Sequence, residues 1–211
     1  MRPILIALVV IVVGSGAAAY CRLVRQAATS DLTDFGRRRD KGSPTETATF
    51  AAGCFWKLEH AMRNVDGVVS TEAGYAGGDA PGDGARGDGA PGDVSHSTVA
   101  SGRTGHAEAV RVTFDPARVS YDRLLAVFFS SHDPMSFVPV DGEPPGPGRS
   151  AVFYHSGAQR AAAAAFVRRL DDSGKYKVHV PTAVVPAGTF LRAEPEHQQY
   201  LERHAPASCG L

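Results

Sequence analysis

One cysteine of this 211-residue chain stands where a thiol could act as a nucleophile. Cys54 lies between Gly53 and the aromatic pair Phe55-Trp56, and Trp56 is the only tryptophan. A short apolar run precedes it and an amphipathic helical pattern follows, so we expect the sulfur at a helix N-terminus. Backbone N–H groups and the helix dipole favour negative charge there, and the thiolate is the reactive form of cysteine. From position alone, a buried structural cysteine beside core aromatics is an equal alternative.

A second thiol lies close to the end of the chain. Cys209 belongs to the segment APASCGL, residues 205–211, whose small residues predict a loose tail. Such a tail could carry a thiol to a distant site, where it attacks an oxidised sulfur. The alternative is an incidental terminal thiol. Together, Cys54 and Cys209 suggest a redox cycle, and in an oxidising compartment the pair could rest as a disulfide.

A carboxyl group is the third candidate. Glu108 stands near the start of AEAVRVTF, residues 107–114, in an otherwise apolar context. Desolvation at such a place favours the protonated carboxyl, which could deliver a proton to a reacting group. The plainer interpretation is a surface carboxylate on an edge strand.

Composition and motif spacing argue against several other classes of protein. Lys plus Arg and Asp plus Glu number 22 each, which gives no electrostatic argument for a nucleic-acid partner. Three cysteines are too few for a disulfide scaffold. No Cys/His spacing indicates zinc, and no glycine-rich loop of the required form follows a strand, so we expect no metal and no nucleotide cofactor. Nothing in the sequence demands more than a monomer.

The N-terminal part of the chain is expected to lie outside the folded domain. Arg2 and the apolar run Ile4–Val13 make residues 1–21 either a cleaved secretory signal or a retained membrane anchor. Residues 22–46 are charged and lack apolar periodicity, so they are predicted to be a flexible linker. The catalytic domain is then residues 47–211, placed outside the cytoplasm in the periplasm or secreted, and anchored to the membrane if residues 3–21 are retained.

The remaining chain alternates between strand and helix patterns. Helices are expected at 55–65, 120–131, 157–170 and 194–204, and strands at 48–53, 67–78, 107–114, 149–155 and 177–185. A glycine-, proline- and aspartate-rich stretch, residues 77–93, reads as a loop. This mixture predicts an α+β protein, a two-layer α/β sandwich with a mixed sheet and a ferredoxin-like core.

Several of these segments resemble the A-type peptide-methionine sulfoxide reductases. GCFW, GVVSTEAGYAGG, SGRTGHAEAVRVTFDP and HDP occur in the family's order, and YDRLLAVFF, RSAVFYH and EHQQYL fit the same pattern. The resemblance covers roughly residues 46–210. It implies reduction of the S epimer of methionine sulfoxide, free or protein-bound, by a cysteine that opens a helix. It also implies that a thioredoxin-like dithiol supplies the electrons, with no other cofactor.

The resemblance also implies a role for each matching residue. Cys54 would attack the sulfoxide sulfur, Phe55 and Trp56 would hold the substrate's methyl group, and Glu108 would protonate or hydrogen-bond the sulfoxide oxygen. Methionine would leave and Cys54 would become a sulfenic acid. Cys209 would then condense with it into a disulfide.

The chain departs from the family pattern on the polar side of the expected pocket. His96 stands twelve residues before Glu108, where the family usually has a tyrosine. Glu143 stands at an aspartate position and Gly148 at a second tyrosine position, and a glycine does not replace a phenol's hydrogen bond. We therefore expect a functioning reductase that is slow or retuned, with His96 and Glu143 as substrate-binding residues. His106, His132 and His197 are expected to satisfy local hydrogen bonds.

Two other functions stay open at this point. One is a thiol peroxidase or disulfide exchanger that uses Cys54 and Cys209. The other is a non-catalytic module that binds exposed methionines. The GHAEAV segment and the aromatic pair beside Cys54 favour the reductase over both.

Overall fold

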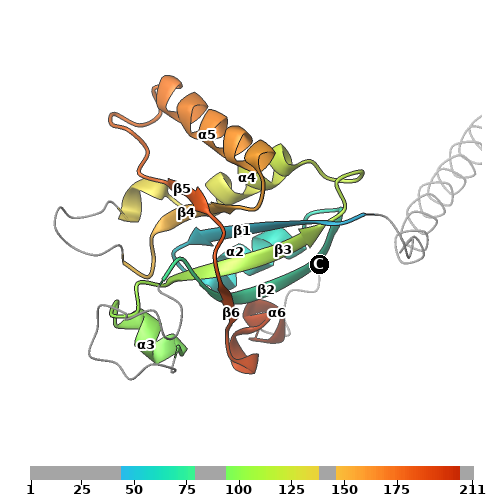
Figure 1. Cartoon of the computed structure of the whole chain (residues 1–211), viewed down its shortest axis with the longest axis vertical. Helices are drawn as coiled ribbons and strands as arrows, with labels where there is room; N and C mark the ends of the chain where they lie inside the picture. Colours follow the sequence, from blue (N-terminus) through green and yellow to red (C-terminus); the bar gives the residue numbers. More distant parts are fainter. Residues whose placement is uncertain (1–43, 79–93, 138–145, 205–211) are drawn as a thin grey trace, which may run out of the picture. The chain divides into compact units, whose positions relative to one another are not determined.

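The computed structural model describes residues 44–78, 94–137 and 146–204. Figure 1 shows a sheet with helices packed on it. In chain order the elements are β1 (Glu46–Ala52), α2 (Phe55–Arg63), β2 (Val68–Ala76), α3 (His96–Ala100), β3 (Ala107–Phe114), α4 (Tyr121–Ser131), the 3-10 helix η1 (Pro134–Phe137), β4 (Ser150–Tyr154), α5 (Gly157–Asp172), β5 (Ala183–Pro186), β6 (Phe190–Arg192), the 3-10 helix η2 (Pro195–His197) and α6 (Tyr200–His204).

The sheet has a mixed, largely antiparallel topology. Its strand order is β5-β4-β1-β3-β2-β6, and only the β4–β5 pair is parallel. The inner strands follow the order β1-α2-β2-β3-α4-β4 along the chain and β4-β1-β3-β2 across the sheet. A β-α-β-β-α-β succession with this strand order is the ferredoxin-like arrangement. The α+β class and the mixed sheet expected from the sequence are therefore confirmed.

The main core lies between the sheet and the helices α2, α4 and α5. Strand β1 alternates across the sheet, so that Ala48, Phe50 and Ala52 belong to this core. Phe50 stacks on Phe128 of α4 with ring centroids 5.2 Å apart. The opposite face carries a smaller cluster made mostly of alanines from β1, β2, β3 and β4, with Phe153 and Phe190 packed against them. Helix α2 is thus held from one side by the sheet, which fixes the residue at its N-terminus.

Local signals predict the ends of several elements correctly. Ser120 and Ser156 are the N-caps of α4 and α5, and each side chain accepts a hydrogen bond from a backbone N–H three residues on. Strand β3 spans residues 107–114 as expected. The strand expected over residues 177–185 is wrong in extent, because β5 occupies only Ala183–Pro186.

The last predicted helix, residues 194–204, is wrong as one element. It is split into η2 and α6, because Gln198 is extended (φ −74°, ψ 127°) and Gln199 is left-handed (φ 53°). At this extended residue, the side chain of Gln198 bonds to both backbone groups of Ala73 in β2. The sequence patterns also missed the short elements α3 and β6.

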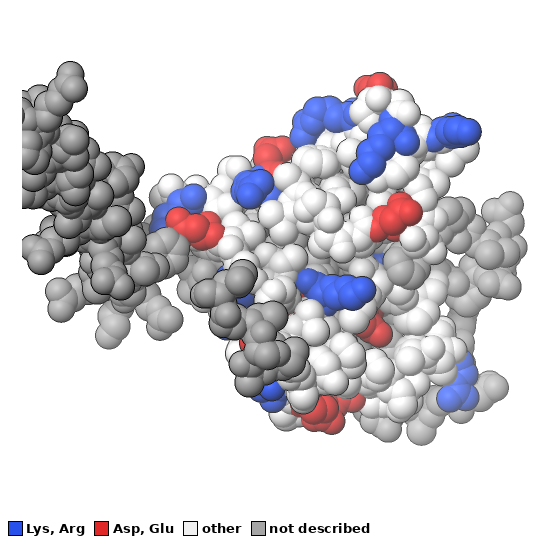
Figure 2. All heavy atoms as spheres, turned by 180° about the vertical axis from the view of Figure 1, so that it is seen from behind, with Lys and Arg blue, Asp and Glu red and all other residues white. Residues whose placement is uncertain are grey.

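The predicted signal or anchor, residues 1–21, and the predicted linker up to residue 43 lie outside the described residues. In the part of the chain that is described, no helix has the length and apolarity needed to cross a bilayer. On the face seen in Figure 2, basic and acidic side chains are interspersed among uncharged ones. Such mixing matches the equal numbers of basic and acidic residues in the sequence.

Candidate active site

Cys54 lies at the junction between β1 and α2. Gly53 has a φ of 70°, a left-handed conformation that glycine adopts without a Cβ clash and that lets the chain turn sharply after β1. Cys54 is the N-cap of α2, with extended backbone angles, and its carbonyl accepts a hydrogen bond from the Leu58 amide at 3.4 Å. Its side chain is exposed. The sequence expectation of an accessible thiol at a helix N-terminus is met in the structure.

Glu108 reaches the same helix end from β3. Glu108 pairs with Tyr75 across the β2–β3 ladder, and the side chain of Glu108 is 17% exposed. Oε2 of Glu108 accepts a hydrogen bond from the amide of Phe55 at 3.3 Å. Because Phe55 directly follows Cys54, this bond holds the carboxyl beside the helix N-terminus. Glu108 is therefore not the exposed edge-strand carboxylate that was the plainer sequence interpretation.

His96 faces the same carboxyl from α3. Its Nε2 lies 3.6 Å from Oε1 of Glu108, and its ring centroid lies 6.0 Å from that of Phe55. The helix is only five residues long, but Ser95 and Thr98 form a capping box at its start. The structure thus brings His96 to the polar side of the site, as the sequence predicted.

A cluster of rings surrounds the start of α2. Phe55 is only 1% exposed and packs beneath His197, with ring centroids 5.5 Å apart. Trp56 is partly buried and stacks on Tyr200 with centroids 3.7 Å apart and planes 8° from parallel. His197 lies 4.5 Å from His96, centroid to centroid. Phe55 is therefore the buried ring of this cluster, whereas Trp56, His96, His197 and Tyr200 are partly exposed around it.

The sequence patterns missed His197 and Tyr200 as site residues. His197 was expected to satisfy a local hydrogen bond, yet its Nδ1 is buried without a hydrogen-bond partner. Tyr200 was part of the family-like segment EHQQYL, which was the available signal. Both residues come from the end of the chain, so their approach to residues 55 and 56 depends on tertiary packing.

Glu194 connects the C-terminal segment to the polar side of the site. Its carboxylate accepts hydrogen bonds from the Tyr75 hydroxyl at 2.7 Å and from the His96 amide at 2.8 Å. Burial opposes its ionisation, but these two hydrogen bonds, together with its own backbone amide and the charge of His197, lower the pKa of Glu194. Burial, together with the bond to Glu194, raises the pKa of Tyr75, which stays a hydrogen-bond donor.

A turn at residues 146–149 forms the far rim of the site. The carbonyl of Pro147 accepts a hydrogen bond from the Glu108 amide at 2.9 Å. Gly148 lies in this turn, so the position that the resemblance assigns to a tyrosine is next to the backbone partner of Glu108 but carries no side chain. Arg149 donates to the carbonyls of Gly77 and Gly105 at 3.1 and 3.0 Å, and burial lowers the pKa of Arg149.

Two predicted site residues lie outside the described residues. They are Glu143, expected to bind substrate, and Cys209, expected to resolve the oxidised Cys54. Their roles stay predictions. Among the described residues, no group of three or more His, Cys, Asp or Glu side chains could hold a metal ion.

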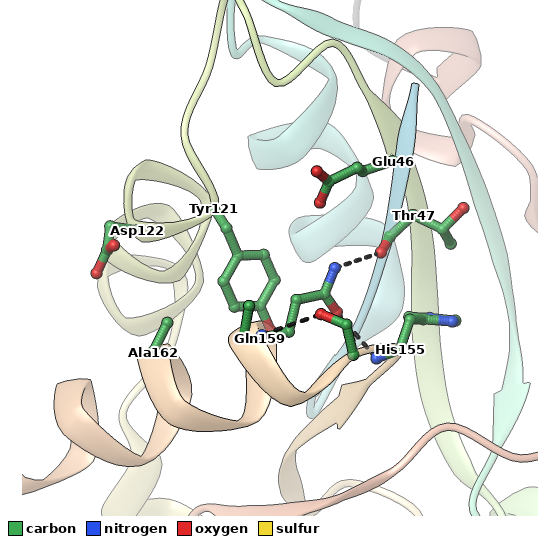
Figure 3. Close-up of a pocket in the computed structure, with 9 residues that line it drawn as sticks. Glu46, Thr47, Tyr121, Asp122, His155, Gln159 and Ala162 are labelled. Carbon is green, nitrogen blue, oxygen red and sulfur yellow. Dashed lines mark hydrogen bonds between the residues drawn. The ribbon is translucent and has the colours of Figure 1, made fainter. Parts of the chain in front are cut away.

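A cavity of about 480 Å³ lies elsewhere, between the start of β1 and the N-termini of α4 and α5 (Figure 3). Gln159 donates there to the Thr47 carbonyl at 2.8 Å and accepts from the His155 amide at 2.9 Å, whereas the buried Tyr121 hydroxyl has no hydrogen-bond partner. None of the predicted site residues lines it. The exposed Cys54 therefore lies outside this cavity.

An exposed sulfur at a helix N-terminus, near a largely buried carboxyl and a partly exposed tryptophan, is an arrangement typical of cysteine-dependent enzymes. The family model for peptide methionine sulfoxide reductase matches residues 46–211. The chain belongs to this family and is an oxidoreductase, a peptide methionine sulfoxide reductase.

Individual relatives agree with this assignment. The chain is 47% identical over 169 residues to peptide methionine sulfoxide reductase MsrA of Methanothermobacter thermautotrophicus, covering 79% of this chain and 92% of that protein. It is 45% identical over 167 residues to MsrA of Geobacter sulfurreducens, with coverage of 78% and 94%. Reduced Mxr1 from Saccharomyces cerevisiae is similar in structure, with a TM-score of 0.62 and 31% identity over 76% of this chain and 86% of that chain. Methionine sulfoxide reductase A of Corynebacterium diphtheriae follows with a TM-score of 0.59 and 28% identity, over 81% and 79%.

Proposed function

We propose that Cys54 attacks the sulfur of a methionine S-sulfoxide while Glu108 gives a proton to the sulfoxide oxygen. The observation that carries this proposal is the hydrogen bond between the Phe55 amide and Oε2 of Glu108, which holds the carboxyl at the same helix end as the thiol. Attack on sulfur places charge on the oxygen, and a nearby carboxylic acid neutralises that charge. Methionine leaves, the oxygen stays on the cysteine, and Cys54 becomes a sulfenic acid.

The surrounding residues orient the substrate. Trp56 offers a partly exposed ring beside the cysteine, against which the methyl group of the sulfoxide packs. Phe55 packs against this ring from the protein interior, since its side chain is almost fully buried. His96 donates a second hydrogen bond to the oxygen from its position next to Glu108. Glu143 is a further substrate-binding residue, as the resemblance implies.

The second half of the cycle restores the thiol. Cys209 attacks the sulfenic sulfur, water leaves and a disulfide forms, which a thioredoxin-like dithiol then reduces. Cys209 lies five positions after His204, the last described residue, and a chain of that length reaches at most about 18 Å. This reach suits attack on a cysteine at the helix that α6 already contacts.

The place of action follows from the sequence of residues 1–21. We propose that they direct the enzyme out of the cytoplasm, where it repairs oxidised proteins as a monomer. The support is the apolar run after Arg2 and the charged stretch that separates it from the folded domain. An alkaline phosphatase fused after residue 46 tests this point, because that reporter is active only after export. An inactive fusion would contradict the proposal.

A reductase assay with separated epimers tests the chemistry. Purified protein is mixed with a methionine S-sulfoxide peptide or its R epimer, with dithiothreitol as reductant. Turnover of the S epimer alone, abolished by Cys54→Ser, is the expected result. Peroxide consumption without sulfoxide turnover would instead indicate a thiol peroxidase, and turnover that survives Cys54→Ser would exclude this mechanism.

A further inference from the structure

The segment after β6 carries two rings of the active site. We call residues 193–200 the strap. His197 of the strap packs over Phe55, and Tyr200 at its end stacks on Trp56. The position of the strap therefore determines the shape of the ring surface beside Cys54.

The middle of the strap is attached to β2. The side chain of Gln198 is buried, accepts a hydrogen bond from the Ala73 amide at 3.1 Å and donates to the Ala73 carbonyl at 2.9 Å. It donates in addition to the carbonyl of Ala193 at 2.9 Å. These bonds hold the strap to the sheet, but they do not reach Tyr200 or helix α2.

A second attachment joins the strap to α2 itself. Glu59 is 1% exposed; its Oε2 accepts a hydrogen bond from the Gln199 amide at 2.7 Å, and its Oε1 accepts one from Thr71 Oγ1 at 3.0 Å. Gln199 is the only described residue other than glycine with a positive φ, 53°. A glutamine is strained there, and the hydrogen bond to the buried Glu59 carboxyl offsets that cost.

We propose that the Glu59–Gln199 hydrogen bond is a latch that keeps Tyr200 flat against Trp56, which makes Glu59 a positioning residue for the substrate surface. Trp56 and Glu59 are three residues apart and share one face of α2. Gln199 and Tyr200 are adjacent on the strap. The Glu59–Gln199 hydrogen bond therefore fixes the distance between the rings of Trp56 and Tyr200. This inference rests on the proposed role of Trp56 in holding the substrate.

Other contacts between the strap region and α2 are weaker. Glu202 of α6 forms ion pairs with His60 at 3.1 Å and with Arg63 at 3.5 Å. These side chains are partly exposed to solvent, and exposed ion pairs contribute little. The buried bond at Glu59 is therefore the contact whose loss should release Tyr200.

The test compares two substitutions at Gln199, whose side chain is exposed, so that neither leaves a cavity. Gln199→Pro removes the amide hydrogen and forces φ to about −65°. Gln199→Gly keeps both the amide hydrogen and the left-handed conformation. The backbone of Gln198 is already extended and tolerates a following proline. Gln199→Pro therefore removes the latch bond and the left-handed backbone of residue 199 together, and Glu59→Ala, compared with Glu59→Gln, removes the bond without changing residue 199.

Trp56 is the only tryptophan, so its fluorescence reports directly on the stack with Tyr200. We expect greater acrylamide quenching and a red-shifted emission for Gln199→Pro, and wild-type behaviour for Gln199→Gly. KM for a sulfoxide peptide should rise roughly three- to tenfold in Gln199→Pro, the effect of losing one aromatic contact, while the single-turnover rate at saturation changes less.

Equal Trp56 quenching and equal KM in the two variants would overturn the latch. If circular dichroism shows Gln199→Pro to be unfolded, Glu59→Ala and Glu59→Gln give the same contrast. The glutamine accepts from Gln199 and donates to Thr71 Oγ1, whereas alanine does neither. A failure of the proposed function can be told apart from a failure of the latch. In the first case wild-type protein lacks Cys54-dependent turnover of the sulfoxide. The fluorescence comparison of the variants then still decides whether the latch positions Tyr200.

Discussion

The amide of Phe55 and the carboxyl of Glu108 are joined by a 3.3 Å hydrogen bond that connects β3 to the start of α2. The amide donates to Oε2, and Oε1 is the oxygen closer to His96. The two oxygens of one carboxyl group thus have different neighbours. This arrangement orients Glu108 by a backbone group, and it leaves the other oxygen facing the polar side of the site.

Glu108→Gln should remove proton delivery while keeping the acceptor for the Phe55 amide. We expect the single-turnover rate with methionine S-sulfoxide to fall roughly 100- to 10,000-fold, the range for loss of a general acid. Alkylation of Cys54 by iodoacetamide is the control and should be little changed. A variant with nearly wild-type turnover would show that the proton comes from another group.

His96→Phe should remove the second donor beside Glu108 without disturbing the ring packing on Phe55. We expect a rate loss of about a hundredfold or more in single turnover, as for one donor to a developing oxyanion. His96→Tyr is the matched variant, because it restores a hydroxyl donor on a ring of similar shape. If phenylalanine and tyrosine at this position gave equal rates, His96 would have no role in binding the oxygen.

Features set by neighbouring residues could be predicted from the sequence. The limits of β3, the start of α4 at Ser120, and the position of Cys54 at the start of α2 each depend on a few adjacent side chains. Hydrophobic periodicity and hydroxyl caps act over the same short range, so the pattern is sufficient there.

Features set by distant residues could not be predicted in this way. The break at Gln199 depends on Glu59, 140 positions away, and on Gln198 bonding to Ala73. A helical pattern therefore continued through residues 194–204, where the structure has two short pieces. His197 enters the site for the same reason, since the strap brings it against Phe55. The short helix α3 comes soon after a glycine-rich loop, and its five residues are too few to show a helical hydrophobic pattern.

Arg149→Lys should weaken the rim of the site, although the charge is kept. Nη2 of Arg149 bonds to the carbonyls of Gly77 and Gly105 while Nη1 bonds to the carbonyl of Gly146, and the single nitrogen of a lysine does not reproduce this two-nitrogen arrangement. We expect the free energy of unfolding, measured in urea, to drop by about 2 kcal/mol. Single turnover should slow as well, because the same turn supplies the backbone partner of Glu108. An unchanged urea midpoint would argue against this anchoring role.

His132 should make the fold less stable in mild acid. It ends α4, with Nδ1 2.8 Å from the Phe128 carbonyl and Nε2 2.9 Å from Ser150 Oγ. Burial lowers the pKa of His132 below 6.5, although the bond to Phe128 and the charge of Asp133 partly oppose that shift. Between this lowered value and about 6.5, the unfolded chain binds a proton that the folded chain excludes. Stability is therefore full above about pH 6.5 and declines as the pH falls through that window.

His132→Gln isolates this contribution. We expect urea unfolding of the wild type to lose stability between about pH 7 and pH 5, and the variant to lose less over the same range. His155, whose pKa burial also lowers, acts in the same direction, and Glu59, whose pKa burial raises, acts in the opposite one. His155 and Glu59 are present in both the wild type and His132→Gln, so their contributions cancel when the two pH dependences are subtracted. Identical slopes for wild type and variant would mean that His132 accepts its proton equally well in the folded state.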